Sequence, residues 1–511
     1  METKKKPNIL LLVTDQQRAV QHWPKGWAAK NLPAMDRLMK NGMTFRKAYA
    51  NTCMCSPSRA SLFTSNYPSK TGVTEVLSLT NAYYSLKEGQ TGGAPARDLQ
   101  GIMKSQFQNM AHVMDAAGYN VVYKGKWHLT KPVIYDQQAK QLKWTDRDIS
   151  HLSNQWGFKG WNPPDAGDTL TYQDMGGGTT NNDGRFVDGK GTRDGRKQTP
   201  KQLQESIERS AVNFLNTYDS DKPFCLIVSL VNPHDVLSYP GDGSTNTSDT
   251  PIYQQGGYQD SDFEDLPIEL PPTFDEDLST KPIVQQSIVE ALSLALGGLN
   301  TTEKQLNYVR FYAYLHKVVD QEMMKVLNAL DKNDLTDETL IIRVSDHGEM
   351  GLSHGGMRQK MSSMYEEAIR VPMIFSNPKL FPKAMETDSL AGLIDILPTI
   401  ADIADAPEIM QASLQGASLK SILLNPDAEV QDHIHYTYDD WDTTYPTDKP
   451  AKMRAIIYKD WKYAVYFDTG SGYECQYEMY NLSDDPNEAC NLAHKKHATP
   501  ESEKKRQELH R

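Results

Sequence analysis

The feature that most constrains the fold is an uninterrupted apolar run over residues 9–13, which leads through Thr14 into Asp15-Gln16. A short run without polar alternation is typical of a strand buried on both faces, as in a parallel sheet covered by helices. In open α/β sheets ligands bind beyond the carboxyl ends of the strands, so Asp15 stands where a metal-binding carboxylate is useful. For a single aspartate, a solvated loop position is the commoner alternative.

Two later segments repeat this pattern. Apolar strands are predicted over residues 224–230 and 339–344, and they are followed by Pro233-His234 and by Ser345-Asp346-His347. The chain therefore predicts an α/β fold with a large, mostly parallel sheet flanked by helices. Arg343 interrupts the last apolar run, and the sequence offers no reason for it.

A cysteine motif follows the first strand. Cys55-Ser56-Pro57-Ser58-Arg59 opens an apolar run over residues 60–64 that predicts the first turns of a helix. A thiol there lies at the positive end of the helix dipole, where an anionic nucleophile and an anionic substrate are both favoured. The alternatives are a buried structural thiol, or half of a redox or metal-binding C-x-C pair with Cys53.

Two basic side chains are predicted to share one side of an extended segment. Lys126 and His128 alternate in Gly125-Lys126-Trp127-His128, after a strand predicted over residues 119–123. Side chains two positions apart in a strand point the same way, so both tips would meet one anion. A basic surface cluster is the alternative.

The rest of the chain suggests a second, smaller unit. Polar connections over residues 130–200 and 239–282 are candidates for the rim of a site. Beyond residue 430 short aromatic strands, at residues 453–458, 461–467 and 474–480, predict a small antiparallel sheet followed by a polar tail. We expect a catalytic domain over residues 1–430 and a C-terminal subdomain over residues 431–511.

Composition limits the partners and the compartment. The formal net charge of -12 argues against nucleic acid, and the later apolar stretch at residues 288–299 falls short of the ~20 residues that span a bilayer, so we expect no membrane partner. Five cysteines favour a reducing compartment. Because residues 9–13 are shorter than the roughly 7–15 residues of a secretory signal, we expect a cytoplasmic location. A chain whose leader had been removed would look the same, so a periplasmic location stays open. The sequence also leaves open whether the protein is a homo-oligomer.

Together these motifs resemble the type I sulfatases, the formylglycine-dependent branch of the alkaline phosphatase superfamily, in order and over nearly the whole chain. The matching segments are Asp15, Cys55-Ser56-Pro57-Ser58-Arg59, Gly125-Lys126-Trp127-His128, Pro233-His234, Ser345-Asp346-His347-Gly348, Lys360 and Tyr480-Asn481-Leu482 with Asp485-Pro486. In this family a formylglycine-generating enzyme oxidises the cysteine of C-x-P-S-R to Cα-formylglycine. Only Cys55 has proline at the second position after it, so Cys53 is excluded. The resemblance implies a mixed sheet and hydrolysis of an aryl or small-molecule sulfate ester.

The resemblance also implies a role for each residue. Oxidised Cys55, Asp15, Asp346 and His347 would ligate one divalent cation, with Gln16 as a weaker candidate. Hydrated formylglycine would attack sulfur in line, held by Arg59. The sulfate oxygens would be surrounded by Lys126, His234 and Lys360, and His234 or Lys360 would give a proton to the leaving oxygen. His128 would take the proton of the second hydroxyl, so that the aldehyde re-forms and sulfate leaves.

Two positions depart from the family pattern. Many sulfatases have a second aspartate where Gln16 stands and an asparagine where His347 stands. This combination is similar to choline-sulfatase and phosphonate monoester hydrolase relatives, so hydrolysis of a phosphonate monoester or a phosphodiester is an alternative. An imidazole ligand moves the metal preference from Ca²⁺ towards Mn²⁺, and both ions stay open. An inactive sulfatase-like binding protein, with Cys55 as an unmodified thiol, is the alternative from another class.

Overall fold

The computed structural model describes residues 6–77, 102–132, 134–136, 141–167, 171–191, 198–440, 449–468 and 472–511. Within them a seven-stranded sheet forms the centre of the molecule. Its strands in spatial order are β10 (Met385–Thr387), β2 (Gly42–Phe45), β9 (Met373–Ser376), β8 (Thr339–Ser345), β1 (Asn8–Asp15), β7 (Phe224–Pro233) and β4 (Asn120–Gly125). Strand β9 is antiparallel to β8 and β2, whereas the other neighbours are parallel. The predicted mixed, mostly parallel sheet is confirmed.

Strand β1 lies inside the sheet, between β8 and β7, and is buried along its whole length. Its odd-numbered apolar residues pack with one helical layer, made of α3 (Cys55–Thr64), α5 (Met110–Ala116) and α15 (Ile396–Ile403). Leu10 and Leu12 pack with the opposite layer, made of α2 (Pro33–Lys40), α9 (Ala211–Thr217) and α12 (Thr302–Lys332). Helices on both faces explain why the run is apolar at every position.

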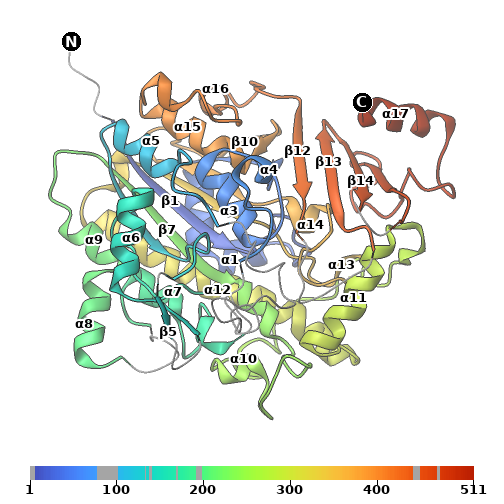
Figure 1. Cartoon of the computed structure of the whole chain (residues 1–511), viewed down its shortest axis with the longest axis horizontal. Helices are drawn as coiled ribbons and strands as arrows, with labels where there is room; N and C mark the ends of the chain where they lie inside the picture. The colour runs from blue at the N-terminus through green and yellow to red at the C-terminus, as the bar shows by residue number, and fades with distance from the viewer. Residues whose placement is uncertain are drawn as a thin grey trace, which may run out of the picture.

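A four-stranded antiparallel sheet lies at one end of the molecule, beside α11 (Ile283–Leu296) and α14 (Glu366–Ile369) (Figure 1). Its strands, in spatial and chain order, are β12 (His433–Tyr438), β13 (Lys452–Tyr458), β14 (Trp461–Phe467) and β15 (Gln476–Asn481). The small antiparallel sheet is thus confirmed, with one strand more than predicted. The tail, predicted only as polar, contains α17 (Pro500–His510), which begins at a capping box formed by Thr499 and Ser502. The boundary at residue 430 stays a prediction.

The polar connection over residues 130–200 is more ordered than predicted. It contains α6 (Asp146–Trp156), α7 (Asn182–Val187) and a hairpin of β5 (Ile134–Asp136) and β6 (Gln141–Lys143). The other elements are β3 (Ala48–Tyr49), β11 (Ala391–Gly392), α1 (Trp27–Asn31), α4 (Pro68–Thr71), α8 (Pro200–Glu208), α10 (Ile252–Gln255), α13 (Ser353–Gly356) and α16 (Lys420–Leu424), with short 3-10 turns between them. In the described part of the chain no helix has the length and hydrophobicity that crossing a membrane requires.

Candidate active site

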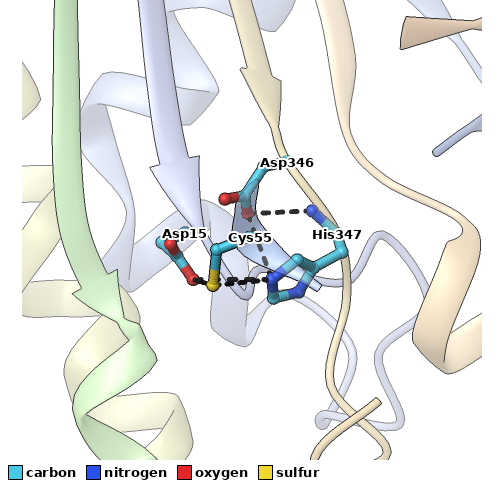
Figure 2. Close-up of side chains that lie close together, drawn as sticks. All are labelled: Asp15, Cys55, Asp346 and His347. Atoms are coloured by element: carbon cyan, nitrogen blue, oxygen red, sulfur yellow. Dashed lines mark hydrogen bonds and ion pairs between the residues drawn. The ribbon is translucent and has the colours of Figure 1, made fainter. Parts of the chain in front are cut away.

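Four residues converge at the carboxyl edge of the central sheet (Figure 2). Asp15 ends β1, Cys55 begins α3, and Asp346 and His347 follow β8. One ligand atom from each lies within 4.8 Å of the others, and all four residues are buried. The Sγ atom of Cys55 is 3.7 Å from Oδ1 of Asp15 and 3.4 Å from Nε2 of His347.

This cluster has the chemistry of a cation site. The Nδ1 atom of His347 lies 3.0 Å from the carbonyl oxygen of Gly348, so Nδ1 carries the proton and Nε2 presents its lone pair. Nε2 faces Oδ1 of Asp15 and Oδ1 of Asp346, each at 3.7 Å. Burial, and then the charge of Asp15, raise the pKa of Asp346 to about 6. A lone pair and two carboxylates repel one another unless a positive charge lies between them, so the residues present fit one divalent ion.

Gln16 lies beside the cluster in a fixed orientation. Its Nε2 donates to a carboxylate oxygen of Glu349 and, at 3.2 Å, to Oε1 of Gln359. Because a carboxylate only accepts, the amide nitrogen faces Glu349 and the amide oxygen accepts from Nζ of Lys360 at 2.7 Å. The backbone N–H of Gln16 donates to Oδ1 of Asp346 at 3.1 Å. Ligation of a metal by the amide oxygen stays a prediction.

Arg59 connects the ends of the strands from a fully buried position. Its guanidinium lies 3.1 Å from Oδ2 of Asp15 and 2.9 Å from Oδ2 of Asp346, and it donates to Oγ of Ser229 at 2.7 Å. Burial lowers the pKa of Arg59, but the two carboxylates outweigh burial and raise it above its usual value. Arg59 therefore stays charged and offsets part of the negative charge of the cluster.

Two lysines make the surroundings of Cys55 positive. The Nζ atom of Lys126 lies 2.6 Å from Oδ2 of Asp15 and donates to the carbonyl oxygen of Gly167 at 2.5 Å. Burial raises the pKa of the Cys55 thiol, but Lys126 and then Lys360 outweigh it and hold that pKa well below its usual value. The site thus stabilises an anion at position 55, as an anionic substrate or nucleophile requires.

The prediction that Lys126 and His128 lie on an extended strand segment is wrong, although both residues lie at the site. Strand β4 ends at Gly125, where φ is 99° and a Cβ atom would lie 1.8 Å from the carbonyl oxygen of Ser229. The chain therefore turns there instead of continuing as a strand. Asp165 holds the new path, because its carboxylate accepts from the N–H groups of Trp127 at 2.8 Å and His128 at 2.7 Å.

One ring nitrogen of His128 is directed at Cys55. Nε2 donates to the carbonyl oxygen of Leu77 at 2.5 Å. The ring also lowers the pKa of the Cys55 thiol. Because Nε2 is already engaged, Nδ1 is the nitrogen left for position 55, and it has no hydrogen-bond partner among the described residues.

His234 stands at the end of β7, where a short 3-10 helix begins. Burial and then Lys126 lower its pKa to about 4, so the ring is neutral at pH 7. Asp183 accepts from the N–H groups of Val231 and Asn232, which precede His234. The carboxylate of Asp235 accepts from the N–H groups of Gly176 and Gly177, each at 3.1 Å. Asp183 and Asp235 therefore lie on either side of the end of β7. A small cavity of about 20 Å³ lies beside His234 and is also lined by Thr171, Asp174, Met175, Asp235, Leu237 and Ser238.

Four acidic residues of this site were missed in the sequence: Asp165, Asp183, Asp235 and Glu349. The first two lie in polar segments that contain many other aspartates, so no spacing distinguishes them. Asp235 and Glu349 directly follow the motifs Pro233-His234 and Asp346-His347-Gly348, which was the available signal.

Fold and site together define a hydrolase of the alkaline phosphatase superfamily. The sulfatase family model matches residues 7–406, and the model described as N-sulphoglucosamine sulphohydrolase, C-terminal, matches residues 354–511. The chain belongs to the sulfatase family, and it is a sulfuric ester hydrolase. Members of this family typically use a metal ion and formylglycine.

Individual relatives are similar at low identity over nearly the whole chain. N-acetylglucosamine-6-O-sulfatase of Bacteroides thetaiotaomicron is 24% identical, with 96% of this chain and 83% of the relative covered. Arylsulfatase K of Mus musculus is also 24% identical, with 96% and 77% covered.

Solved structures share the fold. A 2-O GAG sulfatase has a TM-score of 0.66 at 22% identity, with 98% of this chain and 90% of that chain covered. A protein solved in complex with its substrate D-glucosamine-2-N,6-O-disulfate has a TM-score of 0.64 at 21% identity, with 99% of this chain and 96% of that chain covered. Phosphonate monoester hydrolase of Agrobacterium radiobacter has a TM-score of 0.62 at 18% identity, with 98% and 94% covered.

Proposed function

We propose that this protein hydrolyses the sulfate ester of a small molecule and that residue 55 of the chain, once modified, supplies the nucleophile. The observation that carries the proposal is that Cys55 shares one buried cluster with Asp15, Asp346 and His347 and is acted on by the positive groups Lys126 and Lys360. The Sγ atom of Cys55 stands in for the hydroxyl oxygens of a formylglycine hydrate. That hydrate would supply a nucleophilic hydroxyl and a second hydroxyl. Deprotonation of the second hydroxyl would re-form the aldehyde and expel sulfate.

Three ligand types would hold one divalent ion: the carboxylates of Asp15 and Asp346, the Nε2 atom of His347 and the modified side chain of residue 55. The amide oxygen of Gln16, which accepts from Lys360, is a fifth candidate. The ion would supply concentrated positive charge next to a sulfate oxygen.

The remaining work falls to fixed side chains of this chain. Lys126 is held by Asp15 and Lys360 by Gln16, so both ammonium groups are oriented before a sulfate binds. Neutral His234 donates an N–H hydrogen bond towards the leaving oxygen, and Lys360 is the group that carries a proton to give. His128 accepts a proton at Nδ1, because its Nε2 proton is directed at Leu77.

The leaving group is proposed to be the hydroxyl of an amino sugar, on the similarity to relatives. The cavity of about 20 Å³ beside His234 is far smaller than the roughly 300–1,000 Å³ of drug-sized ligand sites, so its volume does not define the leaving group. The C-terminal family match, the relative named N-acetylglucosamine-6-O-sulfatase and the neighbour bound to a sulfated glucosamine support a sulfated amino sugar.

A phosphonate monoester or phosphodiester hydrolase is the second candidate. Gln16 and His347 favour it, and so does the similarity of fold to a phosphonate monoester hydrolase. The inactive binding protein is the third candidate, and it requires Cys55 to remain a thiol.

One experiment separates the three. Protein produced together with a formylglycine-generating enzyme is digested, and the mass of the peptide that contains residue 55 is measured. Turnover is then compared on glucosamine 6-sulfate, an aryl sulfate and an aryl phosphonate monoester. We expect conversion of Cys55 and the highest kcat/KM on a sulfate ester. A higher kcat/KM on the phosphonate supports the second candidate, and a persistent thiol without turnover supports the third.

A further inference from the structure

The charged residue inside β8, Arg343, has no part in the chemistry above and yet is fully buried. It pairs in register with Leu12 of β1 and Ile374 of β9. Both neighbours belong to the apolar layer under α12. The Nε and Nη1 atoms of Arg343 have no hydrogen-bond partner among the described residues. Burial lowers the pKa of Arg343 to about 10, although the charge of Asp320 opposes this. A buried charge with so few hydrogen bonds destabilises a fold, so its presence needs a reason.

The guanidinium of Arg343 reaches the turn that follows β1. Its Nη2 atom donates to Oγ1 of Thr14 at 3.0 Å and to Oε1 of Gln17. Thr14 in turn donates from Oγ1 to Oε1 of Gln17 at 3.1 Å. Thr14 and Gln17 stand on either side of Asp15-Gln16, so one nitrogen of Arg343 closes a clamp around two residues of the metal site.

The turn enclosed by this clamp is strained. Gln16 has a φ of 67°, in the left-handed region that side-chain-bearing residues rarely adopt and that persists only where surrounding contacts impose it. Because side chains alternate along β1, Thr14 faces Arg343 and α12, whereas Asp15 faces α3 and Cys55. The clamp therefore acts on the metal site from the opposite face of the sheet.

We propose that Arg343 is a positioning residue, which holds residues 14–17 so that Asp15 and Gln16 face the cation. It raises the affinity for metal although its burial weakens the fold. The inference rests on the metal site of the proposed function. Neighbouring contacts on the same turn are neutral: Oγ of Ser345 accepts from the N–H of Gln17 at 2.9 Å, and the hydroxyl of Tyr312 donates to the carbonyl oxygen of Gln16 at 2.7 Å.

Calorimetric titration with Mn²⁺ tests the proposal on protein that carries formylglycine. For Arg343→Met we expect a Kd about 10- to 100-fold weaker than that of the wild type, as for lost partners of metal ligands. We also expect the Tm of its metal-free form to be equal to or higher than that of the wild type, because an apolar side chain replaces a poorly paired charge. A Kd within twofold of the wild type overturns the proposal. The titration is repeated with Ca²⁺ if the wild type does not bind Mn²⁺, and absence of binding of both ions by the wild type overturns the metal site itself, which is a separate result.

Two further variants show whether the effect passes through the clamp. Ile341→Val alters an apolar residue on the same strand and in the same layer, and we expect a lower Tm with an unchanged Kd. Gln17→Met removes one of the two acceptors of Arg343, and we expect a weaker Kd to which adding Arg343→Met brings less than the full loss seen in the single Arg343→Met variant. Additive losses overturn the clamp. If Arg343→Met does not fold, Gln17→Met decides alone, and an unchanged Kd in that variant overturns the proposal.

Discussion

The Nε2 atom of His347 lies 3.4 Å from the Sγ atom of Cys55, although 292 positions separate the two residues in the chain. They meet because β1 and β8 are parallel neighbours that end at the same edge, and α3 begins beside that edge. The side chains around this contact can therefore be replaced one at a time without changing the strands that position them.

Replacing Cys55 by alanine is expected to reduce kcat by about 10⁴-fold or more, because the modified side chain is the proposed nucleophile. Cys53→Ala is the matched control. Burial raises the pKa of Cys53 to about 12, and its Sγ atom donates to the carbonyl oxygen of Ala368 at 3.4 Å. We expect the control to lose about 1 kcal/mol of stability and to keep its turnover. Turnover assays and Tm measurements on both variants check this, and equal activities would contradict it.

Lys126→Met is expected to lower kcat/KM by about 10²- to 10³-fold, the usual cost of losing one oriented donor. Lys124, two residues earlier, is also buried, but its Nζ donates to the carbonyl oxygen of Gly160 and not into the cluster. Lys124→Met should therefore stay within a few-fold of the wild type. Steady-state kinetics on an aryl sulfate compare the two, and similar losses would remove Lys126 from the site.

His347→Asn is expected to move the metal preference towards Ca²⁺, by about tenfold in the ratio of the Kd for Mn²⁺ to that for Ca²⁺. An imidazole nitrogen suits transition ions, whereas an amide oxygen suits Ca²⁺. His128→Asn serves as the control, because that ring is directed at Leu77 and Cys55 and is not one of the proposed ligands. Titration with each ion gives the ratio, and an unchanged ratio in His347→Asn would exclude its nitrogen as a ligand.

His354 predicts a loss of stability at alkaline pH. Its Nδ1 lies 2.6 Å from Oε2 of Glu276 and its Nε2 lies 3.4 Å from Oε2 of Glu367. Burial lowers the pKa of His354, but Glu367 and Glu276 outweigh burial and raise it from 6.5 to about 9. Because the pKa is higher in the folded state, this stabilisation is complete below pH 6.5 and is lost as the pH rises through 9.

We expect the free energy of unfolding to fall by about 3 kcal/mol or less between pH 6.5 and 9.5 from this residue. Lys281, whose Nζ lies 2.9 Å from Oε1 of Glu276, stays in place to pair that carboxylate. Urea unfolding at several pH values measures the slope. His354→Gln removes the charge and should flatten the curve over this range. Parallel curves for variant and wild type would show that His354 does not titrate as described.

The sequence was sufficient to place the site residues that lie at the carboxyl ends of strands. Asp15, Asp346 and His347 could be placed because the apolar runs define both the strands and their ends. Cys55 and Arg59 lie four residues apart on one helix, so local periodicity brings them to the same side.

Other parts of the site depend on contacts that the sequence does not display. The path of residues 126–128 is decided by the turn at Gly125 and by the carboxylate of Asp165, which are 40 positions apart. The connection over residues 130–200 contributes Thr171, Asp174 and Met175 to the cavity beside His234, and Asp235 holds it there by accepting the N–H groups of Gly176 and Gly177. Arg343 was visible as an interruption of an apolar run, but its target in the turn after β1 was not.

The convergence of Asp15, Cys55, Asp346 and His347 also sets a time order for biosynthesis. The first two leave the ribosome early, whereas the last two follow only after β7 and α12 have been made. A nascent chain halted before residue 346 therefore lacks half of the cluster, however well its first strands have paired. Retention of an ion at this edge would report that the whole central sheet has been assembled.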